Sequence, residues 1–255
     1  MIGSIGHLEN IIYSDLYLSA VYSVDRFFYA IFDKNHNLLQ SDLDPIDKSE
    51  LADLVSRGFH KKILAIDGTS VHLPEQIEVG DLLDSFVHTA PGGSSHSDRI
   101  LGAKANTHYV IDRKSEEIIT AFFQPDEIFN LSTVVASYMY PATKDKVMVL
   151  ITEGSLYISA MGPDGPKLLN RYAATEKEDI LYYLLLVFDK LKLDPLGTRI
   201  DVAGKIKNDA GVLNHLKSYF SNIQFVEPVI LNLPENSDHP KHLFLDQYMT
   251  YLCAL

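Results

Sequence analysis

The stretch LYLSAVYS at residues 16–23 is followed closely by RFFYAIF at residues 26–32, and this pair decides the fold class. The first segment alternates well enough for a half-buried strand, and the second is aromatic and branched on both faces, so each predicts a β-strand. A turn signal, DKNH at residues 33–36, precedes NLLQS at residues 37–41, which predicts a third strand. We therefore expect three consecutive strands near the start of the chain.

A helix and a fourth strand complete this unit. Asp47 and Glu50 have the spacing of a capping box, and Gly58 stands where a glycine commonly follows a helix end. Together with the apolar face between them, these signals predict a helix over residues 48–57. Residues 62–66, KILAI, then predict a buried strand. The predicted order is strand, strand, strand, helix, strand.

The second half of the chain repeats this order. Its long helix begins at Thr175, which has capping-box spacing to Glu178, and continues to about Leu193 with apolar residues at a helical period. A further helix and strand follow. The expected elements are strands at 146–152, 155–160, 167–172, 199–203 and 222–226, and helices at 175–193 and 210–220.

The repetition predicts an α/β protein with mixed sheets, made of two tandem ribonuclease-H-like lobes, as in the actin-like ATPase fold. We expect an N-terminal lobe at 1–141 with an inserted hairpin, and a C-terminal lobe at 142–255 with a C-terminal helix that docks on the body. The alternative is a single, unrelated mixed α/β domain. Within the N-terminal lobe we expect a flexible loop at 91–97, hairpin strands at 107–112 and 117–123, and a helix at 127–138.

The charge balance argues against several partners. The 255 residues include 22 Lys and Arg against 34 Asp and Glu, a formal charge of −12, and the basic residues are scattered. Because nucleic acids and anionic membranes attract clustered cations, we expect neither as a partner. No apolar run approaches the roughly 20 residues of a membrane span. No secretory signal is visible, and Cys253 is the single cysteine, so we expect a cytoplasmic protein.

The strand FFYAIF at residues 27–32 and the helix segment YYLLLV at residues 182–187 belong to a pattern that resembles a known family. This is the domain-of-unknown-function family 3822, found in Bacteroidetes. The resemblance covers nearly the whole chain. It implies an actin-like ATPase fold and implies no established activity.

ATPases of that fold hold the phosphates of ATP with a glycine turn in the first hairpin of each lobe, typically Asp-x-Gly-Ser or Asp-x-Gly-Thr. In the first lobe, the corresponding turn has Asp25 but no glycine. In the second lobe, Gly154 and Ser155 are kept, but Thr152 stands where the aspartate is expected. The second turn is therefore the better-preserved half of the phosphate machinery.

The adenosine motif of these ATPases usually has two adjacent glycines after a late strand, and here Gly204 with Lys205 supplies one. The resemblance thus implies a candidate nucleotide cleft formed by Thr152, Gly154, Ser155, Gly204 and Lys205. The missing aspartate and the missing glycine argue against phosphoryl transfer, so we assign no catalytic residue. We interpret IDGTS, at residues 66–70, as a turn because it lacks the intervening residue and follows the fourth strand.

Other catalytic motifs are absent from the sequence. There is no P-loop, no Gly-x-Gly-x-x-Gly and no Gly-x-Ser-x-Gly. His239 and His242 form only a weak metal signal. Ser94, His96 and Asp98 include the residue types of a catalytic triad, but a triad is assembled from separated segments and these are neighbours in one loop. We expect no metal site.

Two functional hypotheses follow. The first is a non-catalytic cytoplasmic protein of actin-like fold that binds an unknown protein partner through its lobes or cleft, without a cofactor. The second is a degenerate or unusual ATP-binding protein that uses ATP and Mg²⁺. A cleft filled by bulky side chains would favour the first hypothesis, and an open cleft lined by Gly154 and Gly204 with bound nucleotide would favour the second.

Overall fold

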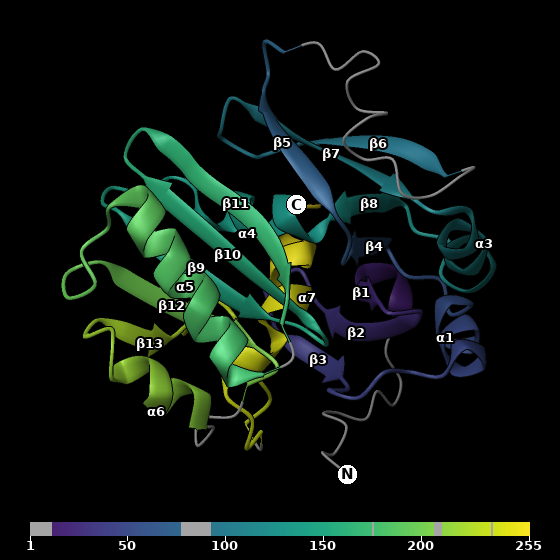
Figure 1. Cartoon of the computed structure of the whole chain (residues 1–255). Coiled ribbons are helices and arrows are strands. Elements are labelled where there is room, and N and C mark those ends of the chain that lie inside the picture. Colours follow the sequence, from purple (N-terminus) through teal and green to yellow (C-terminus); the bar gives the residue numbers. More distant parts are fainter. Residues whose placement is uncertain (1–11, 78–92, 175, 207–210, 236) are drawn as a thin grey trace.

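The computed structural model describes residues 12–77, 93–174, 176–206, 211–235 and 237–255. Two five-stranded sheets have the same topology, with strand orders β3-β2-β1-β4-β8 and β11-β10-β9-β12-β13. A three-stranded sheet of order β5-β7-β6 is added to the first of them (Figure 1). The repeated element order confirms the predicted α/β class and the actin-like architecture. The limits of the two lobes at residues 141 and 142 stay a prediction.

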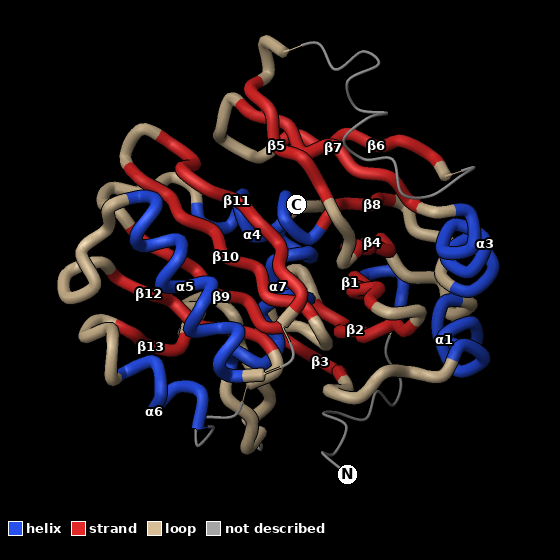
Figure 2. Tube along the Cα trace, in the orientation of Figure 1, coloured by secondary structure: helices blue, strands red, loops and turns tan. Residues whose placement is uncertain are grey.

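The first sheet follows from the aromatic and branched strands at the start of the chain. β1 is antiparallel to β2, which is antiparallel to β3, and β4 and β8 continue the sheet in parallel from the other side of β1. Helices α1 and α3 cover its outer face (Figure 2). The bounds are β1 Tyr17–Ser23, β2 Arg26–Phe32, β3 Leu38–Ser41, β4 Lys61–Ile66, β8 Glu127–Asn130, α1 Lys48–Val55 and α3 Arg113–Phe122, after a short 3-10 helix, Tyr13–Asp15.

The second sheet repeats this arrangement. β9, β10 and β11 are antiparallel neighbours, β12 is parallel to β9, and β13 is parallel to β12. Helices α5 and α6 cover its outer face. The bounds are β9 Lys146–Ile151, β10 Ser155–Gly162, β11 Gly165–Ala173, β12 Arg199–Gly204, β13 Ile223–Phe225, α5 Lys177–Leu191 and α6 Gly211–Lys217.

Two helices fill the space between the sheets (Figure 2). They are α4, Leu131–Met139, and α7, Leu245–Leu252, which follows a 3-10 turn at Lys241–Phe244. Side chains from both sheets share one apolar core with them, and every residue of α7 from 245 to 251 is buried. Ser19 of β1 donates a hydrogen bond to the carbonyl of Gln247, 2.7 Å away. The C-terminal helix therefore packs between the two sheets.

The inserted region is a small sheet rather than a hairpin. It consists of β5 Ser70–Pro74, β6 Ser94–Arg99 and β7 Ala105–Ile111, and all its pairings are antiparallel. The strand predicted at 107–112 is confirmed by β7, but the one at 117–123 is wrong, because these residues belong mainly to α3. Asp112 caps this helix by accepting a hydrogen bond from the Ser115 backbone at 3.0 Å, and Ile119 turns toward the core.

Other expectations need correction. The helix predicted at 127–138 begins only at Leu131, because residues 127–130 extend the first sheet as β8 and Asn130 caps the helix. The predicted loop at 91–97 contains the start of β6, while residues 91 and 92 lie outside the described part. Thr175 also lies outside it; the capping box of α5 is formed by Glu176 and Asp179.

Within the described ranges, none of the helices combines the length and the apolar character that crossing a membrane requires.

The packing of α7 predicts a large effect of Tyr251→Ala. The Tyr251 ring is fully buried, its centroid lies 4.8 Å from that of Phe32, and its hydroxyl donates to the Asp33 carbonyl at 2.9 Å. We expect a loss of roughly 3–5 kcal/mol in the free energy of unfolding, measured by urea denaturation. The matched control is Tyr182→Ala on α5, where the side chain is 61% exposed; its loss should stay below about 1 kcal/mol. Equal losses would contradict the central role of α7.

Candidate functional site

The five predicted nucleotide residues lie together at one edge of the second sheet. Thr152 and Gly154 belong to the turn between β9 and β10, and Ser155 opens β10. Gly204 ends β12 beside Ile151, the last residue of β9. Because β9 and β12 are parallel, their carboxyl ends share an edge, and Lys205 follows directly. The resemblance therefore identified a real cluster, although a role in nucleotide binding stays a prediction.

Local backbone structure explains why glycine stands at positions 154 and 204. Gly154 has φ +84°, a conformation that favours glycine, and a Cβ added there would meet no atom within 4 Å. Gly204 has φ +92°, and an added Cβ would lie 2.1 Å from the Ile151 carbonyl oxygen. Close strand packing alone therefore requires a glycine at position 204.

Thr152, which stands where an aspartate was expected, is held by the protein itself. Its Oγ1 lies 3.1 Å from Oδ2 of Asp67 and 3.2 Å from the Ser155 carbonyl oxygen. The Ser155 hydroxyl is buried and has no hydrogen-bond partner within the described ranges. Asp25 of the first turn is bound to Tyr22 and to Lys114 of α3. Neither turn thus presents a free aspartate.

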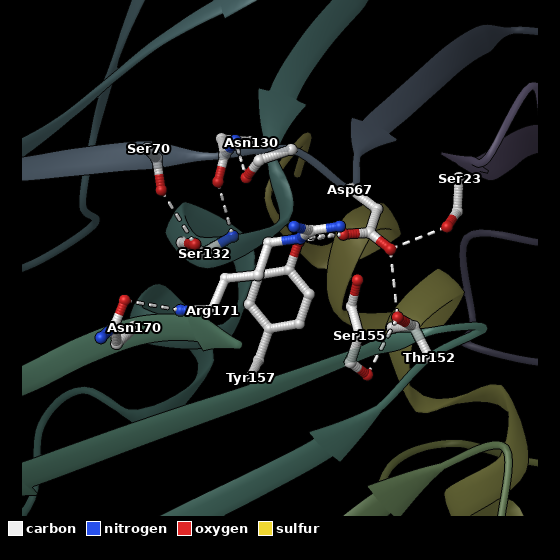
Figure 3. Close-up of polar contacts among 11 residues, drawn as sticks. Ser23, Asp67, Ser70, Asn130, Ser132, Thr152, Ser155, Tyr157, Asn170 and Arg171 are labelled. Carbon is white, nitrogen blue, oxygen red and sulfur yellow. Dashed lines mark hydrogen bonds and ion pairs between the residues drawn. The ribbon is translucent and has the colours of Figure 1, made fainter. Parts of the chain in front are cut away.

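Asp67, at the end of β4, is the centre of a network that joins the two sheets (Figure 3). Its carboxylate is fully buried and accepts hydrogen bonds from Ser23 of the first sheet at 2.7 Å and from Tyr157 of β10 at 2.6 Å. Arg171 of β11 adds an ion pair through Nε, also at 2.6 Å. With Thr152, four donors from both sheets therefore hold one carboxylate, and we call this group the Asp67 network.

The aromatic member of the Asp67 network is buried. Tyr157 is 1% exposed. Burial, together with the charge of Asp67, raises the pKa of Tyr157 well above its ordinary value, so the phenol stays a neutral donor. The network was missed from the sequence because its members come from distant segments, and the turn at residues 66–70 carries no local signal for them.

A pocket of about 560 Å³ opens beside the Gly154 turn, with walls from both sheets. We call it the interlobe pocket. Apolar residues and prolines form much of the lining, and charged side chains gather near the turn. Its residues are Arg26, Leu43, Asp44, Pro45, Glu153, Lys205, Ile206, His239, Pro240 and Leu243.

Two cations of this pocket share one carboxylate. Arg26 of β2 forms an ion pair with Glu153, and Nζ of Lys205 lies 3.6 Å from the other oxygen of Glu153. Lys205 also lies over the Phe28 ring. The nearby Asp246 is fully buried, and burial raises its pKa to about 6 although Lys205 opposes the shift. At the charged end of the pocket, Glu153 therefore lies between Arg26 and Lys205, and an anionic group that enters would compete with its carboxylate.

The metal and triad signals of the sequence can be located in the described part of the chain. Groups of three or more His, Cys, Asp or Glu side chains that could hold a metal ion are absent from it. Of the three triad-like residues, Asp98 is buried and accepts hydrogen bonds from Tyr109 and the Asn130 backbone. Ser94 lies 2.9 Å from the His96 ring, which stacks on Tyr109. These residues serve the inserted sheet.

The Asp67 network predicts that Arg171→Met is strongly destabilising. Removing the guanidinium leaves a buried carboxylate with hydroxyl donors only, so we expect a loss of about 2–4 kcal/mol in the free energy of unfolding, measured by urea denaturation. Arg113→Met is the control, because its ion pair with Glu117 is exposed and should contribute at most about 0.5 kcal/mol. The double variant Arg171→Met, Asp67→Asn should recover part of the loss. A double variant that is additive would disprove the coupling.

Solved structures of other proteins share this architecture. A protein with actin-like ATPase fold and unknown function from Bacteroides thetaiotaomicron is similar over 88% of this chain and 95% of its own, with a TM-score of 0.71 and 16% identity. A structure of the PilM-PilN type IV pilus biogenesis complex is similar over 92% of this chain and 97% of the other, with a TM-score of 0.61 and 10% identity. At these identities the likeness establishes the fold alone.

No curated protein matches the sequence. The model of one protein family, described as a protein of unknown function (DUF3822), matches residues 72–223, which is more than half of the chain. The chain therefore belongs to the DUF3822 family.

Proposed function

We propose that this chain is a non-hydrolysing binding protein that takes a segment of a protein partner in its interlobe pocket. The observation that carries the proposal is the Asp67 network. Thr152 of the turn, together with Tyr157 and Arg171, is bound to the buried carboxylate of Asp67. The residue that stands where ATPases of this fold are expected to carry an aspartate is thus bound within the protein, which supports a role without hydrolysis. The single cysteine is typical of reducing compartments, which supports a cytoplasmic location.

The lining of the interlobe pocket indicates the chemistry of the partner. Leu43, Pro45 and Leu243 offer an apolar wall, while the two cations Arg26 and Lys205 share the carboxylate of Glu153. An extended segment with an apolar side chain beside an acidic residue complements both parts. In the PilM-PilN complex, a protein of similar fold is solved with a protein partner, which supports this kind of role.

Nucleotide binding is the second candidate, because the interlobe pocket adjoins the Gly154 turn and includes Lys205. Thermal unfolding with and without about 1 mM MgATP distinguishes nucleotide binding from the proposed partner binding. A site with a Kd near 10 µM would add about 2.7 kcal/mol at that concentration, which raises Tm by roughly 5 °C or more. We expect a shift below about 1 °C. A clear shift that Lys205→Met abolishes would establish a nucleotide site and overturn the proposal.

Partner binding is tested by panning a phage-displayed library of random peptides on the full chain. We expect enrichment of peptides that place Asp or Glu beside Leu, Ile or Phe. The affinity of a synthetic copy should fall at least tenfold in Arg26→Met, Lys205→Met, because both cations are lost. Lys190→Met, Lys192→Met on the exposed end of α5 removes the same charge and should leave the affinity unchanged. Absence of enrichment, or equal binding by both double variants, would contradict the proposal.

A further inference from the structure

A second pocket, of about 480 Å³, lies at the opposite ends of the same strands, where β9 and β12 begin. The segment that joins the two sheets, residues 141–146, forms one wall, and Gly197, Arg199, Asp201 and Asn222 form the rest. We call it the joint pocket. Its volume lies within the range of small-molecule sites, roughly 300–1,000 Å³.

The cations of the joint pocket exceed its anions. Oδ1 of Asp145 lies 2.7 Å from Nζ of Lys167, and Asp201 is bound by Nε of Arg199, also at 2.7 Å. Both carboxylates are thereby neutralised. Lys144 and Lys146 form no ion pair with any of the described residues. Two ammonium groups thus remain unpaired in one concavity of a chain whose net charge is −12.

The position of Lys146 adds to this imbalance. It opens β9 directly opposite Arg199 in the parallel ladder, so two like charges stand at neighbouring positions. Its side chain is half-buried, and burial lowers the pKa of its ammonium group, which Asp201 raises and Arg199 lowers. A desolvated cation without a counterion is unfavourable, and an anion bound in the pocket would remove that cost.

We propose that the joint pocket binds the phosphate group of a small phosphorylated metabolite. A phosphate monoester carries a charge of about −1.5 to −2 at neutral pH, which matches the two unpaired ammonium groups. The volume of about 480 Å³ suits a small ligand. A nucleic acid would need a longer track of cations than this acidic chain offers. The proposal is independent of the proposed function, since it uses neither Arg26 nor Lys205.

The test is calorimetric titration of the full chain with inorganic phosphate and with pyrophosphate, at ionic strength matched with NaCl. We expect saturable binding with a Kd below about 1 mM. Lys144→Met, Lys146→Met should weaken it at least tenfold. Lys190→Met, Lys192→Met, with the same change in net charge, should leave it within twofold. Lys144→Met alone provides a variant at an exposed position, and it should weaken binding about threefold even if replacing Lys146 impairs folding.

Three outcomes would overturn the proposal. The first is no binding at about 10 mM phosphate or pyrophosphate, and the second is equal weakening by both double variants. The third is binding of a single-stranded RNA oligonucleotide without binding of either small phosphate. A thermal shift with MgATP that persists in Lys205→Met but disappears in Lys144→Met, Lys146→Met would assign the nucleotide phosphates to the joint pocket. That result would support this proposal and leave the interlobe pocket free of nucleotide.

Discussion

One buried carboxylate, that of Asp67, determines how the two sheets face each other. Burying this charge is unfavourable unless every donor is in place. One donor comes from β1, and the others come from the β9–β10 turn, from β10 and from β11. Moving one sheet away from the other would leave the charge buried and unpaired. The chain itself therefore stabilises this arrangement of the two sheets, beside which the interlobe pocket opens.

The order of the elements could be predicted because its signals are local. β2 is aromatic and branched on both faces and is buried on both. β1 alternates, which predicts a half-buried strand, but it is buried on both faces because Ser19 and Ser23 find hydrogen-bond acceptors inside the protein. The turn at residues 33–36 is fixed by Asp33, which accepts hydrogen bonds from the backbones of Asn35 and Asn37. Residues 117–123 were misjudged because a short apolar run fits a strand and a helix equally well. The cap at Asp112 was the local signal that distinguishes them.

The site was predictable only in part, for a related reason. The resemblance identified Gly154 and Gly204, and the parallel pairing of β9 and β12 brings them to one edge. Residues 66–70 are interpreted as a turn because their motif is incomplete and follows the fourth strand. The role of Asp67 has no local signal, because its charged partner, Arg171, lies 104 positions away. A buried ion pair of this kind becomes visible only when the tertiary structure joins the segments. Thr152, which stands where a phosphate motif would have aspartate, is thereby explained as a hydrogen-bond donor to Asp67.

A pocket lies at each end of β9 and β12, and the two pockets differ in how far the protein compensates the charge of their lysines. At the carboxyl ends of the strands, Lys205 already has Glu153 within 4 Å and the buried Asp246 nearby, so its positive charge is largely compensated by the protein. At their amino ends, Lys146 stands beside Arg199 with no carboxylate of its own. A cation that is paired with carboxylates of the protein holds its surroundings in place. A cation without such a partner still attracts an anion from solution. The two ends are therefore suited to different kinds of ligand, a mixed apolar and acidic segment at one and a compact anion at the other.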